Sequence, residues 1–365
     1  MNVAVFVAGL AVVACTWESV VRTLVIPRGL SSRLTAIVSA VVRGSFDFVA
    51  ARFSSYARKD AILVAQGPAT LLAQLTVWLA LFLVGFGLLF QGANGNGFHD
   101  ATRESVSWVF TLGSVTTDST LSTAVGVVAA ATGLVVVALQ VGYLPTLYSA
   151  FNRREALVTM LQSRAGEPAW GPEILARHHI VATLDKLPSF YADWEGWAAD
   201  VSESHTNYPV LITFRSPQPN RSWVVGLLAV LDSAAMHLAL NPSARGSEAR
   251  LCLRMGFTCM RDLCRAMGIP YDPDPRPDAA LRLTYDDFLR GVARLEAVGY
   301  PIERAPEEAW PHFKGWRVNY EAQCYAVAAA VEAVPAVWSG PRRHSAEVLL
   351  PVAPKNRTPA APDRG

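Results

Sequence analysis

An uncharged apolar run at residues 68–90 most constrains what this chain can fold into. It reads PATLLAQLTVWLALFLVGFGLLF, and a helix of this length, at about 1.5 Å per residue, crosses the roughly 30 Å hydrocarbon core of a bilayer. A second uncharged run, TLSTAVGVVAAATGLVVVALQVGYL, covers residues 120–144. The sequence therefore predicts an integral membrane protein in which both runs are helices, because only helices and closed barrels satisfy the backbone in lipid.

The N-terminal residues form a third apolar run, roughly 2–25. A secretory signal peptide places basic residues before its apolar core, but no base precedes Arg22 here. We therefore expect an uncleaved membrane helix within residues 1–30. Glu18 and Arg22 lie four residues apart near its end and can form an ion pair on one helix face.

The next segment, residues 31–60, combines apolar residues at helical spacing with five bases: Arg33, Arg43, Arg52, Arg58 and Lys59. Basic amphipathic helices of this kind lie in the plane of the lipid headgroups. We predict such an interfacial helix, and the alternative is an ordinary helix packed on a soluble domain.

The distribution of charge predicts the orientation in the membrane. Residues 1–150 hold 6 acids and 8 bases, whereas residues 151–365 hold 24 of each. Seven bases separate the first two spans, and only Arg103 separates the second from the third. By the positive-inside rule, the N-terminus lies outside the inner (plasma) membrane, and the chain after residue 150 is cytoplasmic. The neutral charge balance of that part gives no support for a nucleic-acid partner.

The loop between the second and third spans, residues 91–119, carries the main functional signal. It contains a polar stretch (GANGNGFHD), a short helical segment (ATRESVSWVF) and a polar stretch rich in Thr and Ser (TLGSVTTDST). Non-helical backbone at membrane depth is tolerated where it lines a water-filled path or is buried in protein. This order predicts a re-entrant pore loop within a two-span module at residues 61–150.

Residues 68–150 resemble the two-span pore module of the potassium channel superfamily, whose filter reads T-V-G-Y-G. The matching residues here are Thr111, Leu112, Gly113, Ser114 and Val115. A second register places Ser114 and Val115 on the T-V pair of that family. The resemblance implies a homotetramer that conducts monovalent cations, potassium among them, because each chain supplies one quarter of a filter ring.

Two filter positions depart from the family pattern. Ser114 replaces the aromatic residue, and Val115 replaces the last glycine. A β-branched valine resists the positive φ that glycine adopts readily. We therefore expect a weakly selective cation pore gated by the cytoplasmic domain. The alternative hypothesis is a non-conducting membrane sensor or scaffold built on a channel fold.

Three further residues are candidates for roles in a pore. Asp118 would form a ring of four carboxylates at the outer mouth, or it caps the helix that follows. Gly133 is a candidate gating hinge, and close helix packing through a small residue is the alternative. Pro145 either bends the third span at an inner gate or steers the chain into the next domain.

Residues 151–340 are predicted to form a mostly helical cytoplasmic domain, followed by a disordered tail at 341–365. The expected helices are 153–163, 173–185, 187–205, 222–239, 247–267, 284–298 and 317–335, with one strand at 208–216. The apolar segment 222–240 resembles a fourth span, but Asp232 and His237 would be costly in lipid. We interpret it as a buried helix.

No catalytic or cofactor motif is present, so we expect neither enzymatic activity nor a cofactor. The G-x-S-x-G, H-E-x-x-H and G-x-G-x-x-G patterns are absent. We assign structural roles to Ser204-His205 and His178-His179, and core packing rather than metal binding to Cys252, Cys259 and Cys264. The blocks RHHIVATL, ADWEGWAADVSESHTNYP and AWPHFKGWRVNYEA resemble those of uncharacterised actinobacterial channel-like membrane proteins with a degenerate filter.

Overall fold

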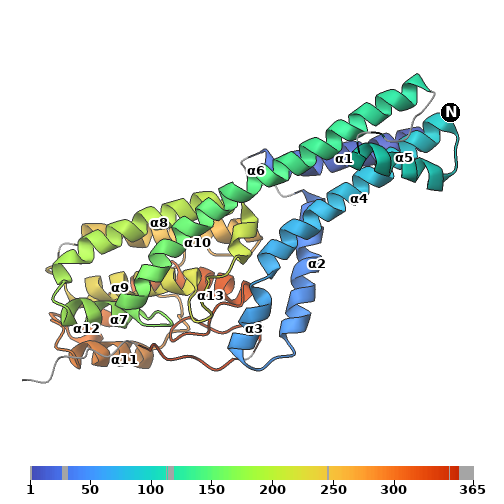
Figure 1. Cartoon of the computed structure of the whole chain (residues 1–365). Coiled ribbons are helices and arrows are strands. Elements are labelled where there is room, and N and C mark those ends of the chain that lie inside the picture. Colours follow the sequence, from blue (N-terminus) through green and yellow to red (C-terminus); the bar gives the residue numbers. More distant parts are fainter. Residues whose placement is uncertain are drawn as a thin grey trace, which may run out of the picture. The chain divides into compact units, whose positions relative to one another are not determined.

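The computed structural model describes residues 2–26, 32–111, 113, 119–244, 246–344 and 346–352. Within these ranges the chain is mainly α and forms no strand, only two isolated β-bridges (Figure 1). The predicted fold class, a mainly α membrane protein, is thus confirmed. The chain divides into a membrane unit (Met1–Ala50, Ile62–Phe151 and Asn207–Phe214) and a C-terminal unit (Ala51–Ala61, Asn152–Thr206 and Arg215–Gly365).

The membrane unit consists of long apolar helices joined by short connections. Its elements are α1 (Val3–Leu24), α2 (Arg33–Ala50), the end of α3 (Tyr56–Leu63), α4 (Gln66–Asn94), α5 (Phe98–Thr111), the first part of α6 (Thr120–Ala165) and the 3-10 helix η2 (Pro209–Thr213). Three stretches of this unit are long and apolar enough to cross a membrane, and they include α1, α4 and α6.

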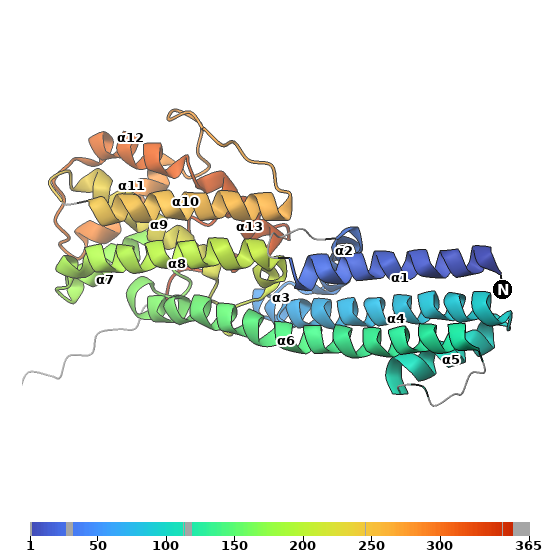
Figure 2. The same ribbon diagram turned by 90° about the horizontal axis from the view of Figure 1, so that it is seen from above.

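Glycines bring α1 and α4 into close contact, and the two helices run side by side (Figure 2). A Cβ atom on Gly9 would lie 2.7 Å from the carbonyl oxygen of Gly85, and one on Gly92 would lie 2.7 Å from the backbone nitrogen of Phe6. The backbone N–H of Asn2 also donates to the carbonyl of Gly92 at 2.7 Å. Small residues at such contacts strengthen helix association in lipid, where burial of apolar side chains alone supplies little driving force.

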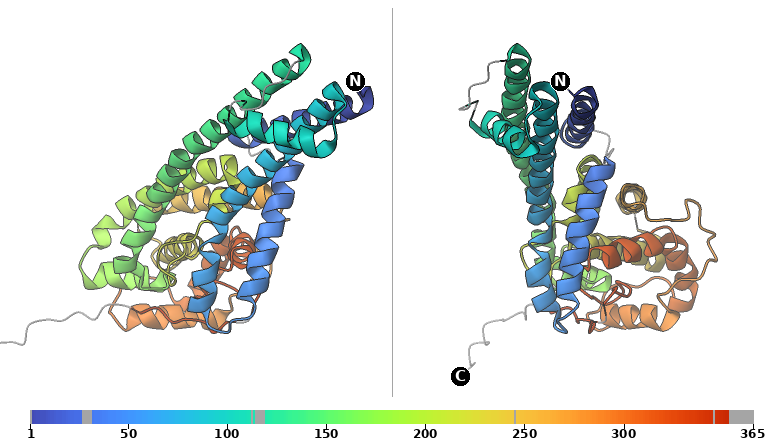
Figure 3. Two further views of the ribbon diagram at one scale, coloured as in Figure 1. Left: turned by 45° about the vertical axis from the view of Figure 1, so that its right-hand side comes forward. Right: turned by 90° about the vertical axis from the view of Figure 1, so that its right-hand side faces the viewer.

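A buried polar cluster joins α2 to the two neighbouring helices, and Figure 3 shows α2 alongside α4. Gln74 of α4 donates to the hydroxyl of Thr35 at 2.6 Å, and the indole N–H of Trp78 donates to Ser19 of α1 at 3.0 Å. The hydroxyls of Ser19 and Ser32 lie 2.7 Å apart. These bonds satisfy polar groups that would otherwise be costly to bury, and they hold α2 on the membrane unit.

The C-terminal unit is a helical domain built around α9. Its elements are most of α3, the last part of α6, α7 (Gly171–Ile180), η1 (Leu184–Lys186), α8 (Leu187–Asn207), α9 (Trp223–Leu240), α10 (Ser247–Met267), α11 (Tyr285–Glu296), α12 (Pro306–Arg317) and α13 (Glu321–Ala330). Helix α9 contacts α7, α10, α12 and α13. In the most apolar 18-residue stretch of α9, 89% of the residues are buried. The corresponding share is 28–39% in the other three candidate spans. This burial agrees with the interpretation of 222–240 as a buried helix.

The predicted strand at 208–216 is wrong, because η2 occupies most of it. A strand would send neighbouring side chains to opposite faces, but the adjacent residues Leu211 and Ile212 are both buried. Pro209 begins the helical turn, and the hydroxyl of Thr213 donates to the carbonyl of Val210 at 2.7 Å.

Two predicted helix boundaries also differ from the structure. No separate helix forms at 153–163, because α6 continues through Pro145 to Ala165 and contributes to both units. The helix expected at 317–335 is the shorter α13, and α12 precedes it. Two prolines obscured α12 in the sequence, yet Pro306 stands at its first position, where no backbone N–H is needed.

Candidate functional site

Helix α5 is a short helix that lies between α4 and α6 in the sequence; it is hydrogen-bonded to α4 and packs against α6. Ser105 of α5 donates to the carbonyl of Leu83 at 2.9 Å, in the middle of α4. The amide of Asn94, at the end of α4, donates to Glu104 of α5 at 3.2 Å. The hydroxyl of Ser122 in α6 donates to the carbonyl oxygen of the same Asn94 side chain. One amide therefore connects all three helices.

Glu104 brings a carboxylate into this junction. Its side chain is buried, and Oε2 accepts the bond from Asn94. Its other oxygen, Oε1, is buried and has no hydrogen-bond partner among the residues that the structure describes. A buried carboxylate oxygen without a donor is unfavourable. Glu104 is therefore an incompletely bonded polar side chain inside the membrane unit.

Trp108 fills the space between the end of α5 and α6. A Cβ atom on Gly113 would lie 2.5 Å from the indole ring, and one on Gly126 of α6 would lie 2.3 Å from it. Gly113 also has a φ of 88°, a region that side-chain-bearing residues rarely adopt. Glycine is thus required at position 113 both for its backbone conformation and for the close approach of Trp108.

Helix α6 also contacts the backbone of α5 directly. A Cβ atom on Gly133 would lie 2.3 Å from the carbonyl oxygen of Val109. The residue proposed as a hinge therefore makes a close helix contact in this structure. Gly142 lies further along α6, and a Cβ atom added to it would have no neighbouring atom within 4 Å.

The predicted filter residues fall partly outside the described residues. Thr111 is the last residue of α5, and its hydroxyl donates to the carbonyl of Ser107 at 2.7 Å. The backbone N–H of Gly113 donates to the same carbonyl at 3.2 Å. Leu112, Ser114, Val115 and Asp118 lie outside the described residues, so both filter registers stay predictions.

The segment Asn207–Phe214 belongs to the membrane unit although both chain neighbours belong to the C-terminal unit. The ring of Tyr208 lies 5.5 Å from that of Tyr143 in α6, and the ring of Phe214 lies 5.9 Å from that of Phe151. A Cβ atom on Gly67, at the start of α4, would lie 2.6 Å from the Phe214 ring. The segment thus packs on the same part of α6 that contains Pro145.

No pattern in the sequence marks Asn94, Trp108 or Phe214 as functional residues. The aromatic run YPVLITF around Phe214 was visible, but it indicated a strand rather than a packed turn. The partners of Asn94 and Trp108 come from helices that are adjacent only in the folded chain, so no local pattern marks these two residues.

His205 and the three cysteines of α10 have structural surroundings in the C-terminal unit. His205 is buried and lies 2.9 Å from Arg154 and from Ser204. Burial, and next the charge of Arg154, lower the pKa of His205 well below its usual value. Cys252, Cys259 and Cys264 are buried in α10, as the core-packing interpretation predicted. In the described part of the chain, no three His, Cys, Asp or Glu side chains gather at a metal-binding spacing.

Comparison with known proteins gives no family assignment for this chain. No protein-family model and no solved structure matches the chain. The chain is similar to the uncharacterized membrane protein YdjJ of Bacillus subtilis (strain 168), with 23% identity over 185 residues. The match covers 47% of this chain and 53% of YdjJ, so the chain spans about half the length of that relative. The comparison and the candidate spans together identify a mainly α membrane protein with a bacterial membrane-protein relative.

Proposed function

We propose that this chain is the subunit of a tetrameric, weakly selective cation channel in the plasma membrane, with α5 as its pore helix. The supporting observation is the junction in which α5 is hydrogen-bonded to α4, packs against α6, and ends two residues before the left-handed Gly113. A short helix followed by a glycine in the left-handed region inside a membrane unit suits a water-filled path. The tight contact of Trp108 with Gly113 and Gly126 would brace that path from behind.

The orientation in this proposal has the N-terminus outside and the C-terminal unit in the cytoplasm. It rests on the seven bases between the first two spans and on Arg103 as the sole base between the second and third. Four copies are proposed because a cation filter is a ring of backbone carbonyls from four equivalent loops.

Gating in this proposal passes through the segment Asn207–Phe214. This segment is covalently continuous with the C-terminal unit at both ends, and it packs on α4 and α6 within the membrane unit. A change in its packing would act on α6 beside Pro145, the proposed inner gate.

The second candidate function is a non-conducting membrane sensor or scaffold. Val115 favours it, because a β-branched residue at the last filter position opposes the positive φ of a carbonyl ring. The two candidates share the fold and differ in whether cations cross the membrane.

The test is cation flux through liposomes that contain the purified full chain, with its mass measured in parallel. We expect a tetramer that releases K⁺ and Na⁺ at similar rates. The variant Gly113→Ala should abolish flux, since it adds a methyl group at a positive φ and against Trp108. Gly95→Ala is the matched control, because Gly95 has a φ of 71° and open space around it. Tetramers without flux at any tested pH or voltage would favour the sensor, and monomers would contradict both candidates.

A further inference from the structure

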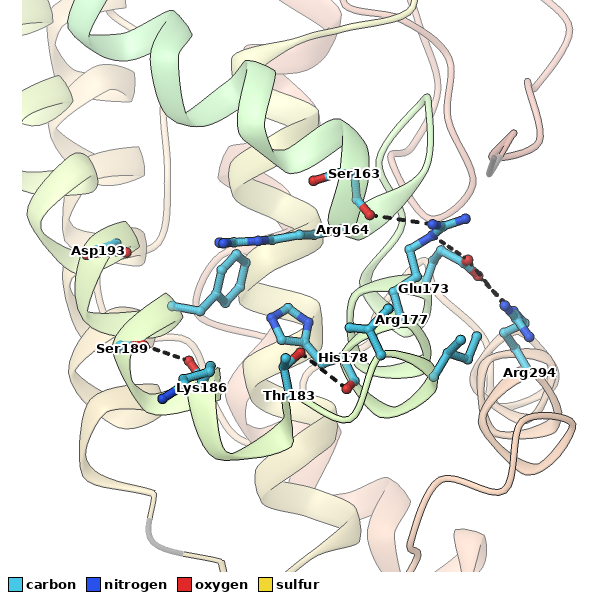
Figure 4. A pocket seen from close by; sticks show the side chains of 13 residues that line it. Ser163, Arg164, Glu173, Arg177, His178, Thr183, Lys186, Ser189, Asp193 and Arg294 are labelled. Carbon is cyan, nitrogen blue, oxygen red and sulfur yellow. Dashed lines mark hydrogen bonds and ion pairs between the residues drawn. The ribbon is translucent and has the colours of Figure 1, made fainter. Parts of the chain in front are cut away.

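The C-terminal unit contains a cavity of about 560 Å³. Its walls come from the end of α6, from α7, η1 and α8, and from α11 (Figure 4). Binding sites for small molecules commonly enclose roughly 300–1,000 Å³. The cavity therefore has the size of a site for one small ligand, and all of its lining residues belong to the same unit.

The lining is cationic. It carries four cationic side chains and two carboxylates: Arg164, Arg177, Lys186, Arg294, Glu173 and Asp193. Four positive charges against two negative ones leave an excess of two. A buried or half-enclosed excess of this kind favours an anionic ligand, because the low dielectric of the cavity wall strengthens the attraction.

Glu173 forms ion pairs with two of the four cationic side chains. One of its oxygens accepts from Arg177 at 2.9 Å, and the other accepts from Arg294 at 2.7 Å. The carboxylate is buried, so it fixes the positions of both guanidinium groups on one side of the cavity. One carboxylate neutralises only one of these two cations, so this side keeps one excess positive charge. The second excess charge comes from Arg164 and Lys186, which are opposed by the single carboxylate of Asp193.

Arg164 has no carboxylate within 4.0 Å in the part of the chain that the structure describes, and its guanidinium lies over the ring of Phe190 at 5.5 Å. An aromatic face orients a guanidinium without neutralising it. Lys186 pairs at 3.3 Å with Asp185, but both side chains are more than two-thirds exposed, and such pairs contribute little. Arg164 and Lys186 are thus available to an anion.

His178 completes this side of the cavity as a neutral group. Its Nδ1 lies 2.7 Å from the carbonyl of Ile174 and donates to it, so Nε2 is left as an acceptor. Burial lowers the pKa of His178, the bond to Ile174 opposes this effect, and the nearby charge of Arg164 lowers the pKa further. A neutral imidazole beside two cations can accept a bond from a hydroxyl group of a ligand.

We propose that this cavity binds a small organic phosphate, with its phosphate on Arg164 and Lys186 and its organic part against the apolar wall at Ile180 and Val181. A phosphomonoester carries about −1.5 to −2 charges at pH 7, which matches the excess of two positive charges in the lining. Guanidinium groups bind phosphate through paired, charge-assisted hydrogen bonds. The site extends the proposed function, since it gives the C-terminal unit a ligand, but it does not depend on ion conduction.

The experiment is calorimetric titration of the full chain in phosphatidylcholine nanodiscs with glycerol 3-phosphate, and with succinate as a dicarboxylate of similar charge. We expect glycerol 3-phosphate to bind and succinate to bind at least about tenfold more weakly, because phosphate offers three oxygens to the cations. Equal binding of the two, or binding of neither, would overturn the proposal.

Variants locate the site. Arg164→Gln and Lys186→Gln should each weaken binding of glycerol 3-phosphate by about tenfold or more, as loss of a charged hydrogen bond predicts. Lys186 is 69% exposed, so its substitution leaves the fold intact even if Arg164→Gln does not. Arg276→Gln, an exposed position outside the cavity, is the control and should bind normally. Unchanged binding in Lys186→Gln and Arg164→Gln would place the phosphate elsewhere and contradict the proposal.

A second arm identifies the source of the phosphate. The same titration is repeated in nanodiscs that contain phosphatidic acid. Competition by this lipid, lost in Lys186→Gln, would assign the site to a lipid headgroup. No competition would assign it to a soluble phosphate. Binding is measured without ion flux, so failure here and failure of the channel proposal are separate results.

Discussion

Gly133 of α6 lies directly against the carbonyl of Val109 in α5, so close that an added Cβ atom would be 2.3 Å from that oxygen. Gly133→Ala must therefore push the two helices apart, whereas Gly142→Ala adds a methyl group in open space. Overpacking typically costs about 1–3 kcal/mol. We expect Gly133→Ala to lower the midpoint of thermal unfolding of the purified chain and to reduce flux, and Gly142→Ala to change neither. Equal midpoints for the two variants would argue against the contact.

A second prediction concerns the buried pair of Arg154 and His205. Arg154 donates to Nε2 of His205 at 2.9 Å, so His205 must be neutral in the folded chain. Because its folded pKa lies below the unfolded value, the unfolded chain binds the extra proton, and stability falls as the pH drops below about 6.5. Each pKa unit of difference contributes about 1.4 kcal/mol. His178 and His237 shift in the same direction through burial.

The measurement is the thermal midpoint between pH 7.5 and pH 5. The variant His205→Gln keeps an acceptor for Arg154 but does not titrate, so its midpoint should fall less than that of the natural chain. The exposed His312 serves as the control through His312→Gln, which should leave the pH dependence unchanged. A slope in His205→Gln as steep as in the natural chain would refute this account of acid sensitivity.

A third prediction concerns the ionic core of the C-terminal unit. Arg317 is fully buried and donates to Asp232, to Glu321 at 3.0 Å and to the hydroxyl of Tyr325 at 2.9 Å. Removing one partner of a buried ion pair costs about 3–5 kcal/mol, because the remaining charge stays buried. Arg317→Leu should therefore unfold the C-terminal unit at a much lower denaturant concentration, as followed by tryptophan fluorescence. Arg276→Ala, which breaks an exposed pair, should have little effect.

A fourth prediction tests the gating segment. Phe214 contacts Phe151 and the backbone at Gly67 within the membrane unit. Phe214→Ala removes both contacts, so it should change the open probability of single channels while the thermal midpoint of the C-terminal unit stays constant. Thr206→Ala, just before the segment, is a control that leaves these rings in place. Identical open probabilities for Phe214→Ala and the natural chain would remove this segment from the gating proposal.

The sequence predicted the spans well because a bilayer imposes a length and an absence of charge that can be read directly. The apolar runs at 68–90 and 120–144 lie within α4 and α6. The short helix before Gly113 was likewise expected and is α5. Asp232 and His237 correctly marked 222–240 as buried in protein, where Arg317 supplies the counter-charge.

The sequence failed where contacts between distant residues decide the structure. The segment 208–216 has the composition of a strand. Its backbone forms a helical turn instead, and its aromatic rings pack on α6. Asn94 has no local signal, because its partners Glu104 and Ser122 lie on two other helices. The cationic cavity is likewise assembled from five helices, so no spacing in the sequence points to it.

The most direct test of the channel proposal is the reversal potential across a planar bilayer with K⁺ on one side and Na⁺ on the other. We expect a current that reverses near zero for the natural chain. The double variant Ser114→Tyr/Val115→Gly should move the reversal toward the K⁺ equilibrium potential, because it supplies the aromatic residue and the glycine of a selective filter. The absence of current in both proteins, with tetramers intact, would contradict the account.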